Sequence, residues 1–186
     1  MNLCDINVIK PLLQKHGFHF SKSKGQNFLT QSWVPREIAD GAGIDKTCGV
    51  LEVGPGIGPL TQALCENAEK VVSVEVDTSL APVLAETMAD TDNFTLIFGD
   101  ILKTDIPALV QEHFQGLRPM ACANLPYYIT SPVLSALLGK ANSVTVAPTC
   151  DKLEEDEGGT GIFSPARLTA ARLLRLSAGE GVSCEV

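Results

Sequence analysis

Short apolar runs alternate with amphipathic segments along the middle of this 186-residue chain. Each run is four to six residues long, which is the length of a buried strand and too short for a core helix. The runs predict strands at residues 50–53, 70–75, 94–98, 120–124 and 144–147. The segments between them predict helices near residues 59–66, 79–88, 106–114 and 131–138.

Strands that alternate with helices through short connections predict an α/β fold with a doubly wound, mostly parallel sheet. Thr78 or Ser79 is expected to cap the second helix, and Pro132 is expected in the first turn of the fourth. Such sheets bind ligands outside the carboxyl ends of their strands. The residues that follow each strand are therefore the candidates for a binding site.

The composition divides the chain into three parts. Residues 1–47 form a basic lead-in, residues 48–147 the alternating core, and residues 148–186 a tail that opens with an acidic run. The tail is expected to hold a loop or disordered link, followed by one helix over about residues 164–176.

Composition excludes several classes of protein. Hydrophobic residues make up 45% of the chain and charged residues 19%, which suits a closed core and argues against disorder throughout. No apolar run approaches the roughly 20 residues of a membrane helix, and the first residues lack the pattern of a secretory signal. The six cysteines are scattered without metal-binding spacing. We expect a soluble cytoplasmic protein that uses neither a membrane nor a metal.

The charge distribution leaves a nucleic-acid partner open. A net charge of −8 argues against one, because phosphate contacts need lysine and arginine. Residues 10–36, however, contain five basic residues and no acidic one. Clustered basic residues allow RNA binding whatever the net charge is.

A glycine-rich loop follows the first predicted strand. It reads Gly54-Pro-Gly-Ile-Gly58, and glycines at such a position let the backbone pass close to a ligand at a helix N-terminus. A dinucleotide fingerprint would need its third glycine where this chain has Pro59. The loop therefore favours a different adenosine cofactor, although a merely tight turn remains the alternative.

Acidic residues follow the next two strands. Glu75 closes the second strand, where a carboxylate can accept hydrogen bonds from both ribose hydroxyls, and Asp100 follows the third, where it can accept one from an adenine amino group. Either acid alone would be explained as a solvated residue at the end of a strand. Together with the glycine loop they fit S-adenosylmethionine.

The fourth strand ends in Asn124-Leu-Pro-Tyr127. Methyl transfer to an exocyclic amine requires acceptors for both amine hydrogens, which the Asn124 side chain and the Leu125 carbonyl can supply. Pro126 would fix the turn, and Tyr127 offers a face for a flipped-out base. An ordinary strand-to-helix turn with a packed tyrosine is the alternative.

Five ordered motifs resemble those of the ribosomal RNA adenine dimethyltransferases, and most closely the bacterial KsgA (RsmA) family. The motifs are Gly25-Gln-Asn-Phe-Leu29, Leu51-Glu-Val-Gly-Pro-Gly-Ile-Gly-Pro-Leu-Thr61, Val72-Ser-Val-Glu-Val-Asp77, Gly99-Asp100 and Asn124-Leu-Pro-Tyr-Tyr128. The resemblance covers about residues 11–140. It implies the Rossmann-like fold of class I S-adenosylmethionine-dependent methyltransferases. It also implies dimethylation at N6 of two adjacent adenines in a hairpin near the 3′ end of 16S ribosomal RNA.

The resemblance also assigns roles to residues. The cofactor-binding positions are Gln26, Asn27, Leu29, Gly54, Gly56, Glu75, Asp100 and Asn124. The positions implied to hold the target adenine are Asn124, Leu125, Pro126 and Tyr127. The basic residues expected to face RNA phosphates are Lys15, Lys22, Lys24 and Arg36. The partner would be 16S ribosomal RNA within the small ribosomal subunit or its precursor.

The resemblance ends after about residue 146. The family continues its sheet and adds a small helical domain, whereas residues 148–186 do not follow that pattern. We therefore expect a truncated or divergent member that lacks the last part of the sheet and the helical domain. Two alternatives remain. The chain could be another amino-group methyltransferase, acting on DNA adenine or protein glutamine, or a fragment that binds RNA or ribosomes without catalysis.

Overall fold

The computed structural model describes residues 1–18, 29, 31–125, 127–140 and 145–148. Its centre is a parallel sheet with the strand order β3-β2-β1-β4-β5. The strands are β1 (Cys48–Val53), β2 (Lys70–Glu75), β3 (Phe94–Phe98), β4 (Arg118–Ala123) and β5 (Thr145–Pro148). This confirms the predicted doubly wound sheet, with strand ends within two residues of the predicted ones.

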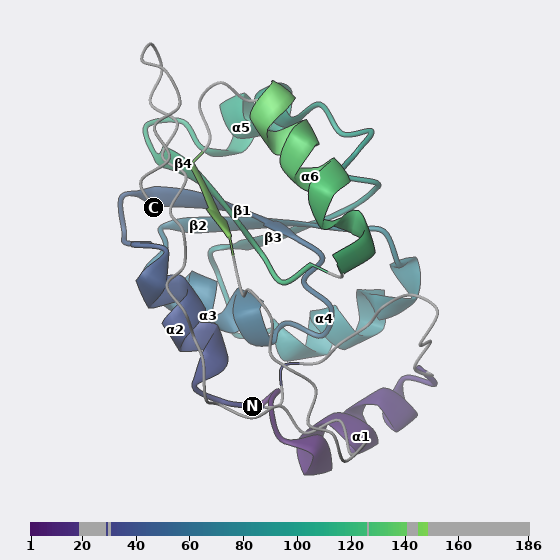
Figure 1. Ribbon diagram of the computed structural model, residues 1–186. Helices are drawn as coiled ribbons and strands as arrows, with labels where there is room; N and C mark the ends of the chain where they lie inside the picture. The colour runs from purple at the N-terminus through teal and green to yellow at the C-terminus, as the bar shows by residue number, and fades with distance from the viewer. Residues whose placement is uncertain (19–28, 30, 126, 141–144, 149–186) are drawn as a thin grey trace, which may run out of the picture.

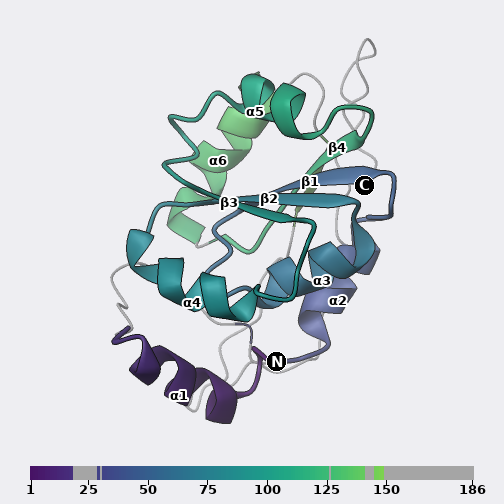
Figure 2. The same ribbon diagram turned by 180° about the vertical axis from the view of Figure 1, so that it is seen from behind.

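Helices cover both faces of the sheet (Figures 1 and 2). The helices are α1 (Ile6–Lys15), α2 (Val34–Gly41), α3 (Pro59–Asn67), α4 (Ala81–Thr87), α5 (Ile106–His113) and α6 (Tyr127–Lys140). Helices α5 and α6 lie on one face, and α2, α3 and α4 lie on the other. Helix α1 lies outside α4, farther from the sheet.

Strand β1 separates two apolar cores. All six of its residues are buried, because helices pack on both of its faces. Cys48 and Val50 belong to the core beneath α2, α3 and α4, and Leu51 and Val53 belong to the core beneath α5 and α6. Apart from Glu52, the strand therefore lacks the polar positions that an alternating, half-exposed strand would have.

Gly49 in β1 is required by packing. A β-carbon built there would lie 2.4 Å from a ring carbon of Phe114, which follows α5. Side chains essentially never approach so closely, so the aromatic ring occupies the space that any other residue would need. The sequence pattern gave no sign of this contact.

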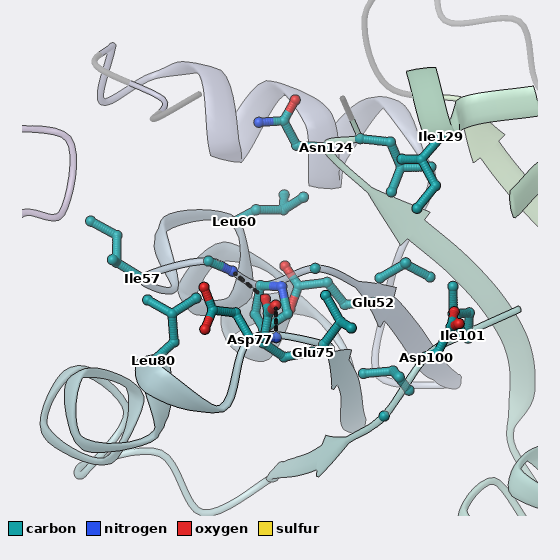
Figure 3. Close-up of a pocket in the computed structure, with 18 of the residues that line it drawn as sticks. Glu52, Ile57, Leu60, Glu75, Asp77, Leu80, Asp100, Ile101, Asn124 and Ile129 are labelled. Atoms are coloured by element: carbon teal, nitrogen blue, oxygen red, sulfur yellow. Dashed lines mark hydrogen bonds between the residues drawn. The ribbon is translucent and has the colours of Figure 1, made fainter. Parts of the chain in front are cut away.

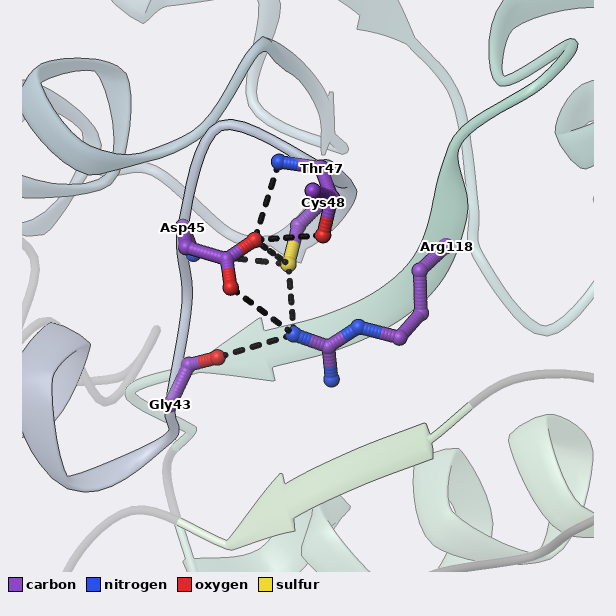
Figure 4. A network of polar contacts seen from close by, with 5 residues as sticks. All are labelled: Gly43, Asp45, Thr47, Cys48 and Arg118. Atoms are coloured by element: carbon purple, nitrogen blue, oxygen red, sulfur yellow. Dashed lines mark hydrogen bonds and ion pairs between the residues drawn. The ribbon is translucent and has the colours of Figure 1, made fainter.

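Polar contacts join the amino ends of β1 and β4 (Figure 4). Arg118 Nη2 donates to the Gly43 carbonyl at 3.0 Å and to Cys48 Sγ at 2.9 Å. Asp45 accepts hydrogen bonds from the Thr47 backbone N–H at 2.9 Å and from the Thr47 hydroxyl at 2.5 Å. These hydrogen bonds, with that of the Thr47 hydroxyl foremost, hold the pKa of Asp45 below its usual value.

Two helices, α1 and α2, lie within residues 1–47, which the sequence analysis described only as a basic lead-in. Helix α1 is capped by Asp5 and buries Ile9, Leu12 and Leu13 despite the internal Pro11. It is tied to α4 by Glu86, which is 2.7 Å from Lys15 Nζ and 2.6 Å from His16 Nε2. Helix α2 carries a proline in its first turn and buries Val34, Pro35, Ile38 and Ala39.

Two predicted helix starts are wrong. Helix α6 begins at Tyr127, so Pro132 lies inside the helix and not in its first turn. The helix includes residues 127–130, which the sequence analysis had assigned to the turn after β4. The second predicted helix begins as a 3₁₀ turn at Thr78–Leu80. Asp77 caps that turn by accepting from the Ser79 backbone N–H, in place of Thr78 or Ser79.

Within the described ranges, no helix is long and apolar enough to cross a membrane. The same residues contain no cluster of three or more histidine, cysteine or acidic side chains that could hold a metal ion.

Candidate functional site

A cavity of about 700 Å³ lies at the carboxyl ends of the strands. Its walls come from the loop after β1, the ends of β2 and β3, the end of β4 and the first turn of α6 (Figure 3). This is the edge where a doubly wound sheet binds its ligands. The predicted cofactor residues with described positions all line it: Leu29, Gly54, Gly56, Glu75, Asp100 and Asn124.

The glycine loop is held in a backbone conformation that other residues rarely adopt. Gly54, Gly56 and Gly58 have φ angles of 71°, 60° and 97°, all in the left-handed region that favours glycine. A β-carbon at Gly54 or Gly56 would meet nothing within 4 Å. The backbone therefore borders open space, which agrees with the predicted close approach of a ligand.

Glu75 lies at the bottom of this loop, only 6% exposed. Its carboxylate accepts from the Asp77 backbone N–H at 2.8 Å and from the Gly56 N–H at 3.4 Å (Figure 3). Burial raises the pKa of Glu75 despite these hydrogen bonds. The carboxylate thus joins β2 to the glycine loop, and its predicted contact with a ribose stays a prediction.

Asp100 is fixed by its own turn. Its Oδ1 accepts from the Leu102 backbone N–H at 3.0 Å. Its Oδ2 lies 3.6 Å from Nζ of Lys103, an exposed side chain. The turn leaves the Asp100 carboxylate half-exposed on the cavity wall, where it can accept a further hydrogen bond.

The end of β4 brings its side chains to the same cavity. Asn124 and Leu125 line it, together with Tyr128 and Ile129 of α6. Figure 3 shows Asn124 on the opposite side of the cavity from Glu75. Pro126 and the Tyr127 side chain lie outside the described part of the chain, as do Gln26 and Asn27. Their predicted roles therefore stay predictions.

The sequence analysis missed Glu52 as a member of the site. This residue of β1 is 1% exposed and contributes to the cavity wall. Its Oε2 accepts from the Ser73 hydroxyl at 2.6 Å and from the Thr61 hydroxyl at 2.8 Å. Among the described atoms, its Oε1 has no hydrogen-bond partner. Burial is the main cause that raises the pKa of Glu52 to about 7. An acid within an otherwise apolar buried strand was the available signal.

The cavity wall is acidic. Four carboxyl groups line it, namely Glu52, Glu75, Asp77 and Asp100. The wall, as far as the described residues form it, contains no lysine, arginine or histidine. Fixed negative charge in a partly enclosed space attracts cations. The arrangement therefore suits a ligand that carries a positive charge, as a sulfonium does.

The predicted RNA-contacting residues do not line this cavity where they are described. Lys15 pairs with Glu86, and Arg36 Nη2 lies 3.7 Å from Glu66 on α3. Both basic side chains are solvent-exposed. Lys22 and Lys24 fall outside the described residues. RNA contact by these four residues stays a prediction.

Comparisons with known proteins agree with this geometry. The family model described as Ribosomal RNA adenine dimethylase matches residues 17–149. Ribosomal RNA small subunit methyltransferase A of Streptococcus gordonii is 47% identical over 139 residues, which are 74% of this chain and 48% of that protein. The protein of Streptococcus mutans with the same name is 46% identical over the same length and shares of the two chains.

A solved structure supports the fold. The crystal structure of the 23S rRNA methyltransferase ErmE has a TM-score of 0.56 and 30% identity, and the match covers 65% of this chain and 46% of that one. The architecture is thus the Rossmann-like fold of class I S-adenosylmethionine-dependent methyltransferases, as predicted. The chain spans about half the length of the curated relatives it matches.

Proposed function

Because the chain belongs to the ribosomal RNA adenine dimethylase family, we propose that it is an S-adenosylmethionine-dependent adenine methyltransferase acting on ribosomal RNA. The finer proposal is N6,N6-dimethylation of two adjacent adenines in the 3′-terminal hairpin of 16S ribosomal RNA. One observation supports the methyltransferase assignment above the others: a single cavity brings together the glycine loop, Glu75, Asp100 and Asn124. We expect the chain to work in the cytoplasm on the small ribosomal subunit or its precursor.

The cavity offers polar groups and open space that suit the methyl donor. Glu75 ends β2 with a buried carboxylate that can accept from ribose hydroxyls, and Asp100 can accept from the adenine amino group. The open space beside Gly54 and Gly56 leaves room for the ligand against the loop backbone. When bound, the donor supplies a methyl group on a positively charged sulfur, which suits the acidic wall.

Asn124 and Leu125 would orient the target amine. An adenine N6 attacks through its lone pair, so its two hydrogens must be directed elsewhere. The Asn124 side-chain oxygen and the Leu125 carbonyl can accept them, and both residues line the cavity. Positioning then carries most of the catalysis. No strong base is required, because the nitrogen loses its proton after it has attacked.

A methylation assay tests this proposal. The purified chain is incubated with radiolabelled S-adenosylmethionine and small-subunit particles that lack adenine dimethylation, with duplex DNA as the competing substrate. We expect label in the 3′-terminal hairpin of 16S ribosomal RNA. Label in DNA alone would favour a DNA methyltransferase. RNA binding without label would favour a fragment that binds RNA without catalysis. That alternative is tested because the chain matches only 48% of the length of its relative.

A further inference from the structure

We propose that Tyr128 is a stacking platform for the base of the nucleotide next to the target adenine, holding the RNA at the mouth of the cavity while the target itself enters. This role rests on the proposed function and deepens it, since it names a contact with the substrate beside the reacting base. The ligand is a nucleobase of any identity, because stacking uses the face that every base has.

Tyr128 is an aromatic residue that the protein leaves in contact with solvent. Its relative exposure is 69%, against 39% for Phe98 and 36% for Trp33, the other exposed aromatic residues in the part of the chain whose burial is described. Of these three residues, Tyr128 alone lines the cavity. Aromatic rings gain much free energy from burial. Most of the surface of this ring can still be covered by a ligand.

Packing inside the protein does not account for the tyrosine. Helix α6 buries Val133, and Ile129 one turn earlier packs against the same core. Ser131 and Pro132, which follow Tyr128 by three and four positions, are exposed, and residues at this spacing share one side of a helix. Tyr128 belongs to neither of the two apolar cores. The ring therefore lies on the solvent side of α6, at the end that borders the cavity.

The charge of the cavity favours contact through a base rather than through a phosphate. The wall carries four carboxyl groups and, within its described lining, no basic side chain. Such a wall repels phosphates, so ion pairs with these lining residues cannot hold the RNA. Stacking on an aromatic ring needs no charge and contributes to affinity at each stacked base. Tyr128 offers this contact in the first turn of α6, four residues after Asn124.

The stacked base is a neighbour of the target rather than the target itself. Asn124 and Leu125, the proposed acceptors for the target amine, are half-buried in the cavity wall. Tyr128 is mostly exposed. A base that presents its amine to Asn124 lies within the cavity, whereas a base on the exposed ring lies at the mouth. The two positions suit two successive nucleotides of one strand.

Binding of short RNA hairpins to the full chain tests the contact. Fluorescence anisotropy compares three dye-labelled hairpins. One carries both adjacent adenines, and each of the others has an abasic residue in place of one adenine. For the intact hairpin, Tyr128→Ala should weaken binding about tenfold, the size expected for one lost base–aromatic stack. Tyr128→Phe keeps the ring and should bind like the wild type. Tyr128→Leu keeps apolar bulk without the ring and should bind like Tyr128→Ala.

The abasic hairpins identify the base. In the hairpin that lacks the stacked base, the wild type and Tyr128→Ala should bind equally, because the contact is already absent. In the other abasic hairpin, the loss should stay about tenfold. Since stacking releases no counterions, the ratio between wild type and variant should be the same at low and high salt. An equal loss with all three hairpins, or no loss with the intact one, would overturn the inference.

Methyl transfer to small-subunit particles separates the neighbouring base from the target. Tyr128→Ala should raise KM about tenfold with little change in kcat. A fall in kcat at unchanged KM would place the ring on the target adenine and overturn the inference. Loss of affinity for S-adenosylmethionine in calorimetry would do the same, because Tyr128 would then shape the cofactor cavity. Absence of label with the wild type would overturn the proposed function itself, whereas the hairpins still decide the stacking contact.

Discussion

Carboxyl groups at the two ends of strand β1 have pKa values shifted in opposite directions. At the amino end, Asp45 is exposed, accepts several hydrogen bonds and faces Arg118, so its pKa lies below the usual value. Near the carboxyl end, Glu52 is buried with one oxygen unpartnered among the described atoms, and its pKa rises to about 7. At the amino end, the hydrogen-bond and charge partners of the carboxylate come from the protein itself. The second end is left incomplete where a ligand is expected.

This difference shows where stability and function separate. The amino end joins strands, and Asp45 and Arg118 find their partners there within the protein. The carboxyl end buries Glu52 and Glu75 and holds three glycines at positive φ. Such features cost folding free energy, and proteins retain them mainly at functional sites. Changes at the two ends should therefore affect different measurements.

The largest effect is expected for Asn124→Ala at the carboxyl end. Loss of an acceptor that orients the target amine should reduce methyl transfer by about 10²–10³-fold, the size seen when one positioned polar group is removed from an active site. RNA binding should change little. The matched control is Asn67→Ala at the end of α3, which removes a hydrogen bond to the Ala63 carbonyl far from the cavity lining. Unchanged methyl transfer in Asn124→Ala would remove Asn124 from the mechanism.

The next effect concerns Glu52 and the pH dependence of stability. Its folded pKa is raised, so the folded chain binds the proton more tightly than the unfolded chain does. The contribution of Glu52 to stability should therefore be fully present below the ordinary pKa of 4.5 and be lost as pH rises to about 7. The loss should be on the order of 2–4 kcal/mol. Glu75 adds to it in the same direction.

Urea denaturation between pH 4 and 8 measures this effect in the ligand-free chain. Glu52→Gln should flatten the curve, leaving the smaller contribution of Glu75. A variant curve with the same slope as the wild type would show that folding does not raise the pKa of Glu52, and the contrast between the two ends would fail.

Gly49→Ala should act on stability rather than on binding. The added methyl group would overlap the Phe114 ring, and overpacking of this kind costs about 1–3 kcal/mol. The matched control is Gly41→Ala at the end of α2, where a β-carbon meets nothing within 4 Å. Urea denaturation should separate the two variants. A Gly49→Ala chain as stable as Gly41→Ala would show that the Phe114 ring moves aside easily.

The smallest effect is expected for Asp45→Asn at the amino end. Its folded pKa is lowered, so the ionised carboxylate contributes stability above the ordinary pKa of 3.8 and loses it as pH falls through the folded value. The substitution should lower Tm slightly at pH 7 and make no difference in strong acid. Affinity for S-adenosylmethionine should be unchanged, and a large loss of affinity would connect the two ends of the sheet.

The sequence predicted the sheet and most of the cavity for a clear physical reason. Buried parallel strands read as short apolar runs, and the groups that meet a ligand follow those strands at the carboxyl edge. Gly54, Glu75, Asp100 and Asn124 were found in this way.

The rest depended on contacts between distant segments. Helices α1 and α2 were missed because α1 carries an internal proline and both lie in a segment that was examined only for its charge and for one motif. The role of Gly49 depends on Phe114, which lies 65 residues later in the chain. Glu52 was interpreted only as part of a strand. Its role could not be predicted because its hydrogen-bond partners, Thr61 and Ser73, lie on other elements that the fold brings together.

Calorimetric titration of the wild-type chain with S-adenosylmethionine at pH 8 tests the central claim most directly. The account predicts saturable binding of one ligand per chain, because the described strands and loops by themselves form the acidic cavity. Absence of binding by a chain that is folded by circular dichroism would contradict it. The cavity would then not be a cofactor site in this chain.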